Sequence, residues 1–129
     1  MILETSFIID FLRNESNAVS KMKDLKDKKI PYAITTPSVF ELWGGLYSLE
    51  KSEKQKNNLD LFIEGQVILP LDKESAKEAG EIDGVLVKSG REIDVEDCMI
   101  AGIAITNNRK VLTRDEHFKR IEDLKVEEY

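Results

Sequence analysis

Short, mostly apolar runs recur along the chain, separated by longer segments in which apolar positions follow a helical period. The short runs lie at Ile2–Leu3, Tyr32–Ile34, Val67–Leu69, Val111–Thr113 and Lys125–Val126. Most of them show no alternation of polar and apolar residues, which is typical of strands covered on both faces of a parallel sheet. The pattern therefore predicts an α/β fold, a three-layer α/β/α sandwich around a mostly parallel sheet of four or five strands.

The longer segments predict helices. They are expected at Asn17–Lys29, from Thr36 to Tyr47, around Leu59–Ile63, from Asp72 to about Lys88, from Asp94 to Thr106, and as a short helix up to Ile121. The predicted capping residues are Thr5 or Ser6, Thr36, Asp72 and Asp94. Gly44 and Gly45 cost about 1 kcal/mol each inside a helix. This cost indicates that something approaches their side of the helix, either another helix or a ligand beside Glu41.

The composition is that of an ordinary globular protein. With 129 residues, 41% hydrophobic and 34% charged, we expect one domain spanning residues 1–129. No apolar run is long enough to cross a membrane, and no secretion signal is expected. The only cysteine, Cys98, excludes an internal disulfide and a cysteine-based zinc site, and it fits a reducing cytoplasm. The only histidine, His117, disfavours a Ser-His-Asp triad and a histidine-rich metal site.

The acidic charge limits the classes of nucleic-acid partner. A net charge of −6 and a pI near 4.9 argue against electrostatic wrapping around nucleic acid. They do not exclude an enzyme that acts on nucleic acid, because cations bound to clustered carboxylates reverse the local field.

Glu4, Glu41, Asp97 and Asp115 are acids that the α/β architecture brings to one place. Glu4 and Asp115 follow buried strands, and the carboxyl ends of parallel strands form the edge where such sheets bind ligands. Simpler explanations also exist for three of them: Glu4 and Asp97 as helix-capping residues, and Glu41 as an exposed side chain. Carboxylates sharing one cleft repel each other unless divalent cations lie between them. Oxygen ligands without Cys or His favour Mg²⁺ or Mn²⁺.

Four segments resemble one known family. They are ILETSFIID at 2–10, TPSVFELWGG at 36–45, DCMIA at 97–101 and VLTRDEHF at 111–118. In this order they are similar to the PIN-domain family, especially its VapC-type toxins, over essentially the whole chain. The resemblance implies a metal-dependent endoribonuclease that uses Mg²⁺ or Mn²⁺ to hydrolyse RNA phosphodiester bonds.

The resemblance also implies residue roles and partners. Glu4, Glu41, Asp97 and Asp115 would bind the metal, and Thr5, Ser6 and Thr113 would support the metal or the substrate. The expected partners are structured RNA, a second copy of the chain in a homodimer, and a VapB-type antitoxin. The family nearly always has aspartate where this chain has Glu4, and this departure keeps open an alternative. In that alternative the chain is a PIN-fold protein that binds RNA or a protein without cutting.

The helices between Thr36 and Ile63 carry more apolar residues than one core-facing stripe requires. We expect the surplus to form an exposed groove or dimer surface, made by Leu46, Tyr47, Leu49, Leu59 and Phe62. Contacts to RNA phosphates are expected from basic residues including Lys73, Arg91 and Arg114, which the sequence does not rank.

Overall fold

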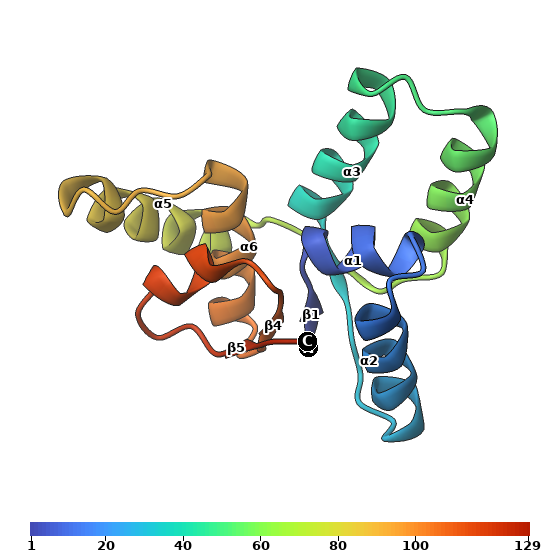
Figure 1. Ribbon diagram of the computed structural model, residues 1–129. Helices are drawn as coiled ribbons and strands as arrows, with labels where there is room; N and C mark the ends of the chain where they lie inside the picture. The colour runs from blue at the N-terminus through green and yellow to red at the C-terminus, as the bar shows by residue number, and fades with distance from the viewer.

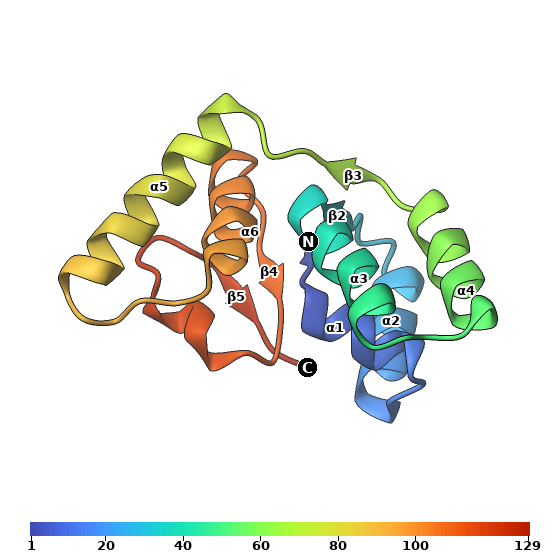
Figure 2. The ribbon, with the colours of Figure 1, turned by 90° about the horizontal axis from the view of Figure 1, so that it is seen from above.

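The computed structural model describes residues 1–129 as seven helices around five very short strands (Figures 1 and 2). The strands are β1 (Ile2–Leu3), β2 (Ile34–Thr35), β3 (Ile68–Leu69), β4 (Val111–Leu112) and β5 (Val126–Glu127). The α-helices are α1 (Thr5–Leu12), α2 (Ser16–Asp27), α3 (Thr36–Ser48), α4 (Glu53–Glu64), α5 (Lys73–Lys88) and α6 (Val95–Thr106). A 3₁₀ helix, η1 (Glu116–Arg120), follows β4.

All strand pairs are parallel, and the strands lie in the order β3-β2-β1-β4-β5. A single bridge between Ile2 and Ala33 joins the β1-β4-β5 part to the β2-β3 part. Because the strands run the same way, their carboxyl ends share one edge. The order reverses between β1 and β4, so this pair forms the switch point where open α/β sheets bind ligands.

Successive residues of the short strands face opposite layers. Ile2 and Val111 belong to a core with α5, α6 and η1, whereas Leu3 and Leu112 belong to a core with α1, α2, α3 and α4. This alternation follows from the two-residue repeat of a strand. The predicted three-layer sandwich around a mostly parallel sheet of four or five strands is confirmed, with five strands that all pair in parallel.

Helix α6 is buried on most sides and crosses α5 closely. A Cβ added at Gly102 would lie 2.5 Å from the carbonyl oxygen of Ser75 and 2.8 Å from the backbone nitrogen of Ala79. Ala79 is buried at this crossing, whereas Ala76 and Gly80 of the same helix are exposed. The close crossing holds α6 against α5.

Two predicted caps belong to the preceding residue. Glu4, rather than Thr5 or Ser6, caps α1 by accepting a hydrogen bond from the Ser6 N–H at 3.0 Å. Thr35, rather than Thr36, caps α3 by accepting from the Ser38 N–H at 3.2 Å. The predictions were one or two residues late for α1 and one residue late for α3, because extended backbone at Glu4 and Thr35 lets their side chains reach the first turn.

The two later caps differ from each other. Asp72 caps α5 as predicted, in a reciprocal arrangement with Ser75. Asp94 stands at the expected position before α6, but its side chain accepts no capping hydrogen bond. No helix is both long and apolar enough to cross a membrane.

Candidate functional site

The four predicted acids come from three different parts of the fold. Glu4 follows β1 and Asp115 follows β4, on either side of the switch point, while Asp97 lies in the first turn of α6. Glu41 lies in α3. Figure 1 shows the beginnings of α1, α3 and α6 close together beyond the end of β1. The structure therefore places all four acids around one edge of the sheet.

Glu4 is buried and held through one of its two carboxylate oxygens. Its Oε2 accepts hydrogen bonds from the Ser6 N–H at 3.0 Å, from the Thr113 hydroxyl at 2.7 Å and from the Ser6 hydroxyl. Burial raises the pKa of Glu4, the hydrogen bonds from Ser6 and Thr113 oppose this rise, and the Asp115 charge adds to it. Oε1 accepts no hydrogen bond from the protein, so it remains available to a ligand.

Asp97 is the acid whose negative charge is least favourable in its surroundings. The residue is buried, with 6% of its surface exposed, and it makes neither an ion pair nor a side-chain hydrogen bond; its carboxylate oxygens still reach the surface, since no fully buried side-chain oxygen lacks a partner. Burial raises its pKa to about 8, and the charges of Glu4, Asp115 and Glu41 add to the shift. The side chain accepts no hydrogen bond from the helix start, so Asp97 does not cap α6, although its place in the first turn lets the helix dipole stabilise its charge.

A hydrogen bond from a hydroxyl group holds the Glu41 side chain on the side of α3 that faces the other acids. The Thr5 hydroxyl donates to Glu41 Oε1 at 2.8 Å and also lies 3.0 Å from the buried Ser38 Oγ. Burial raises the pKa of Glu41, the hydrogen bond from Thr5 opposes the rise, and the charge of Glu4 contributes to it. The expectation that Glu41 is simply exposed is therefore wrong.

Asp115 begins the 3₁₀ helix after β4. Its Oδ1 accepts from the His117 N–H at 2.9 Å and lies 3.1 Å from His117 Nδ1. The Thr113 hydroxyl accepts from the Asp115 N–H at 2.9 Å and donates to Glu4, so it links the ends of β1 and β4. His117 is on the surface and orients this acid.

Several residues of the site have only weak signals in the sequence. Asp94 and Glu96 add negative charge near Glu41, and Asp94 also acts on Asp97. Ser38 is fully buried beside Thr5. The sequence could have indicated Glu96, because it lies in the same first turn of α6 as Asp97. It could not have indicated Ser38, because the position of that residue depends on how α3 packs against α1.

The chemistry of these donors fits a hard divalent cation. They are carboxylate and hydroxyl oxygens, and a buried carboxylate with no partner is costly until a cation approaches it. In the present side-chain arrangement, no group of three or more His, Cys, Asp or Glu residues forms a metal-binding geometry. Glu4 and Asp115 are instead directed toward the backbone at helix starts.

Comparison with known proteins identifies the family. The sequence pattern of the PIN domain matches residues 1–124. This chain belongs to the PIN domain family. Among curated relatives, the chain is 29% identical to the tRNA(fMet)-specific endonuclease VapC of Shigella flexneri, over 99% of this chain and 96% of that protein. It is 26% identical to Ribonuclease VapC2 of Rickettsia felis, again over 99% and 96%.

Solved structures share this PIN fold. The crystal structure of VapBC2 from Rickettsia felis, bound to a DNA fragment from its promoter, superposes with a TM-score of 0.88. The identity is 25%, covering 99% of this chain and 97% of that one. DNA-bound VapBC from Salmonella typhimurium gives a TM-score of 0.80 at 27% identity, covering 98% and 96%.

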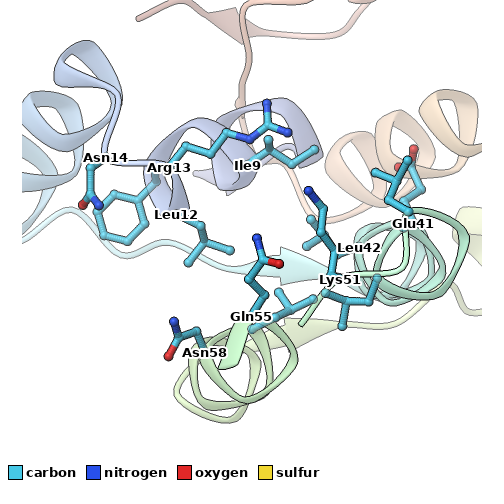
Figure 3. Close-up of a pocket in the computed structure, with 14 residues that line it drawn as sticks. Ile9, Leu12, Arg13, Asn14, Glu41, Leu42, Lys51, Gln55 and Asn58 are labelled. Carbon is cyan, nitrogen blue, oxygen red and sulfur yellow. The ribbon is translucent and has the colours of Figure 1, made fainter. Parts of the chain in front are cut away.

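A groove of about 420 Å³ opens beside the acids of this PIN domain, between α1, α3 and α4 (Figure 3). Leu12 and Leu49 line it and are exposed, and Arg13 and Lys51 lie among them. Figure 3 shows Glu41 at one end, so the groove runs up to the acidic cluster.

The predicted apolar surplus is only partly exposed. Tyr47 and Leu49 are 61% and 65% exposed, and Phe62 is half-buried. Leu46 and Leu59 line the groove, as predicted, but they are not exposed: α4 folds back against α3, and both side chains belong to the core between these helices. A Cβ at Gly44 or Gly45 would meet nothing within 4 Å, so no helix of this chain occupies that side.

Proposed function

We propose that this PIN domain is a Mg²⁺- or Mn²⁺-dependent endoribonuclease of the VapC type, acting in the cytoplasm as the toxin of a toxin–antitoxin pair. The observation that carries the proposal is the unpartnered, buried Asp97, whose pKa is raised by its own burial and by neighbouring carboxylates. A fold does not specify chemistry by itself, so this local feature carries more weight than the sandwich architecture. The names of the VapC relatives support the same activity.

The proposed roles follow from the contacts. Glu4, Glu41, Asp97 and Asp115 would hold the cation, which when bound supplies an activated water and stabilises negative charge on the phosphate. The Thr113 hydroxyl fixes Glu4 relative to Asp115, and Ser6 holds the same Glu4 oxygen. Thr5 orients Glu41. These hydroxyls direct ligand oxygens without adding charge to a crowded site.

RNA cleavage with and without metal tests this proposal. Purified protein is incubated with initiator tRNA in Mn²⁺, in Mg²⁺ and in EDTA, because one relative is named as a tRNA(fMet)-specific endonuclease. The proposal predicts discrete fragments in either metal and intact RNA in EDTA. Cleavage that persists in EDTA, or no cleavage of tRNA or total RNA in either metal, contradicts it.

A second function remains in view, a PIN-fold protein that binds RNA or a protein without cutting. Two observations favour it: Glu4 already caps α1 through Oε2, and no three acids form a metal geometry. In this alternative the acids serve helix starts. The two functions differ in whether Mn²⁺ binds and RNA is cut.

Replacing Glu4 by aspartate separates an adapted site from a decayed one. Removing one methylene draws the carboxylate back by about 1.5 Å, which takes Oε2 out of reach of the Thr113 hydroxyl or the Ser6 N–H. We expect Glu4→Asp to lower Mn²⁺ affinity and the cleavage rate roughly tenfold each, the size of effect typical of disturbing a ligand's support. Calorimetric Mn²⁺ titration and cleavage kinetics measure both.

Glu15→Asp is the matched control for Glu4→Asp. Glu15 is also the residue before a helix, α2, but its side chain makes no capping hydrogen bond. Its shortening should change neither quantity. If Glu4→Asp clearly raises both the Mn²⁺ affinity and the cleavage rate, Glu4 has replaced an ancestral aspartate and the rest of the site has not adjusted to the longer side chain. Absence of cleavage by either Glu4 protein would favour the binding-only function.

The groove and the outer face of α3 are proposed to serve two different partners. The apolar lining of the groove and its extension to Glu41 suit an amphipathic segment of a VapB-type antitoxin. Solved relatives are VapBC complexes. The outer face exposes Phe40, Trp43 and Tyr47 around the uncovered Gly44. We assign this aromatic face to contact between two copies of the chain.

One pair of substitutions tests the two surfaces together. Leu49→Glu places a charge in the groove and should abolish co-purification with a co-expressed VapB-type antitoxin while the protein alone stays dimeric. Phe40→Glu should yield monomers in sedimentation analysis. A wild-type protein that is monomeric at high concentration would refute the dimer surface. Antitoxin that still co-purifies with Leu49→Glu would refute the groove.

A further inference from the structure

Arg114 is a cation placed between two residues of the acidic site. It directly follows Thr113, which binds Glu4, and precedes Asp115. Its Nε lies 2.7 Å from Asp10 Oδ2, and its Nη2 donates to Asp10 Oδ1 at 3.1 Å. This two-point pairing holds the guanidinium plane in one orientation. The Arg114 side chain is nevertheless 60% exposed, whereas that of Asp10 is 10% exposed.

The carboxylate that holds Arg114 is itself fixed from a third side. The Tyr129 hydroxyl donates to Asp10 Oδ2 at 2.6 Å, and the Tyr129 ring meets the buried Phe7 edge-on at 4.8 Å between centroids. Asp10 is buried in α1. Arg114 therefore extends from a rigid support, beside the Tyr129 hydroxyl, into solvent, and its third nitrogen, Nη1, makes no hydrogen bond to the protein.

We propose that Arg114 binds a backbone phosphate of the RNA that enters the acidic site, an inference that rests on the proposed ribonuclease function. A polyanion approaching this cluster of carboxylates needs a cation nearby, and a chain with net charge −6 offers no general attraction. A guanidinium keeps free N–H donors while two others bind a carboxylate, and ordering it beforehand reduces the entropy cost of binding.

The structure thus ranks the basic residues that the sequence left equal. Lys73 and Arg91 have no side-chain hydrogen bond or ion pair to the protein, so nothing holds them toward a ligand. Arg109 is the informative counterpart of Arg114. It precedes β4 and lies at the opposite edge of the sheet, whereas Arg114 follows β4 at the acidic edge.

The test is equilibrium binding of fluorescein-labelled initiator tRNA in EDTA, measured over a series of KCl concentrations. Arg114→Gln alone would leave the Asp10 charge without its cation and add repulsion, so the main variant is the double substitution Asp10→Asn with Arg114→Gln, which conserves net charge. We expect roughly tenfold weaker binding and a slope of log affinity against log salt that is smaller by about 0.7–0.9, the loss of one phosphate contact.

Arg109→Gln is the control and should change the salt slope by much less. If the pair only joins β4 to α1, the double variant melts at a lower temperature but binds tRNA with the wild-type affinity and slope, which overturns the inference. Should the double variant not fold, Arg114→Lys replaces it. It keeps the charge and loses the two-point fork, and wild-type affinity in this variant is the contradicting result.

Failure of the inference and failure of the proposed function have different signatures. Wild-type protein that cleaves tRNA in Mn²⁺, together with a double variant that binds like wild type, refutes the role of Arg114 alone. Wild-type protein that neither binds nor cleaves RNA refutes both.

Discussion

Asp97→Asn is expected to lower the rate of RNA cleavage in Mn²⁺ at least about a hundredfold, because metal catalysis of this kind contributes several kcal/mol and each 1.4 kcal/mol is a tenfold change. Asparagine keeps the size of the side chain and removes the charge. Asp97 is the acid for which this change should matter most, since it is buried and has no hydrogen bond or ion pair to lose. The measurement is single-turnover cleavage of labelled tRNA.

Asp60→Asn is the control for this loss. Asp60 is exposed on α4 and has no ion pair. The same charge change there should leave the cleavage rate within about twofold, as expected for surface substitutions away from a site. Equal cleavage rates for wild type and Asp97→Asn would place the activity elsewhere, in a contaminant or in another part of the chain.

The second large effect concerns stability without metal. The pKa of Asp97 is raised from 3.8 to about 8 in the folded protein, so the folded state holds a proton that the unfolded state releases. Stability therefore falls as the pH rises from about 4 to about 8, and the full penalty is present above that range. Asp97→Asn removes this contribution, so its stability should decline less steeply with pH.

Thermal melting in EDTA measures this difference. At pH 8 we expect Asp97→Asn to melt roughly 5 °C or more above wild type, which corresponds to 1–2 kcal/mol after allowance for solvent screening. At pH 4 the two proteins should melt together. Asp60→Asn should follow wild type throughout. A wild-type melting temperature that stays constant between pH 5 and pH 8 would contradict the electrostatic description of the cluster.

The sequence predicted the architecture because each strand is a short apolar run with helical periodicity on both sides. Ile2–Leu3 and Val111–Leu112 are strands, as predicted, and the structure shows that they pair and that their residues divide between the two cores. The grouping of Glu4 and Asp115 followed from the same rule, since parallel strands end at one edge. Long-range side-chain contacts could not be predicted from local patterns in the sequence. The hydrogen bond from Thr113 to Glu4, for example, joins residues 109 positions apart.

The misplaced predictions share a physical reason. Leu46 and Leu59 have the helical spacing of either an exposed stripe or a core stripe, and only the packing of α3, α4 and α1 decides between them. In the same way, nothing local to Arg114 indicates that Asp10, far away in the sequence in α1, fixes its guanidinium. Which face of a helix is covered depends on the tertiary arrangement rather than on its own period.

The central claim, that these carboxylates bind a divalent cation, is tested most directly by calorimetric titration of Mn²⁺ into the metal-free protein. The account predicts saturable binding to wild type, at least about tenfold weaker binding to Asp97→Asn, and a melting temperature that Mn²⁺ raises in wild type only. Absence of binding to wild type, or equal affinity in the two proteins, would contradict it.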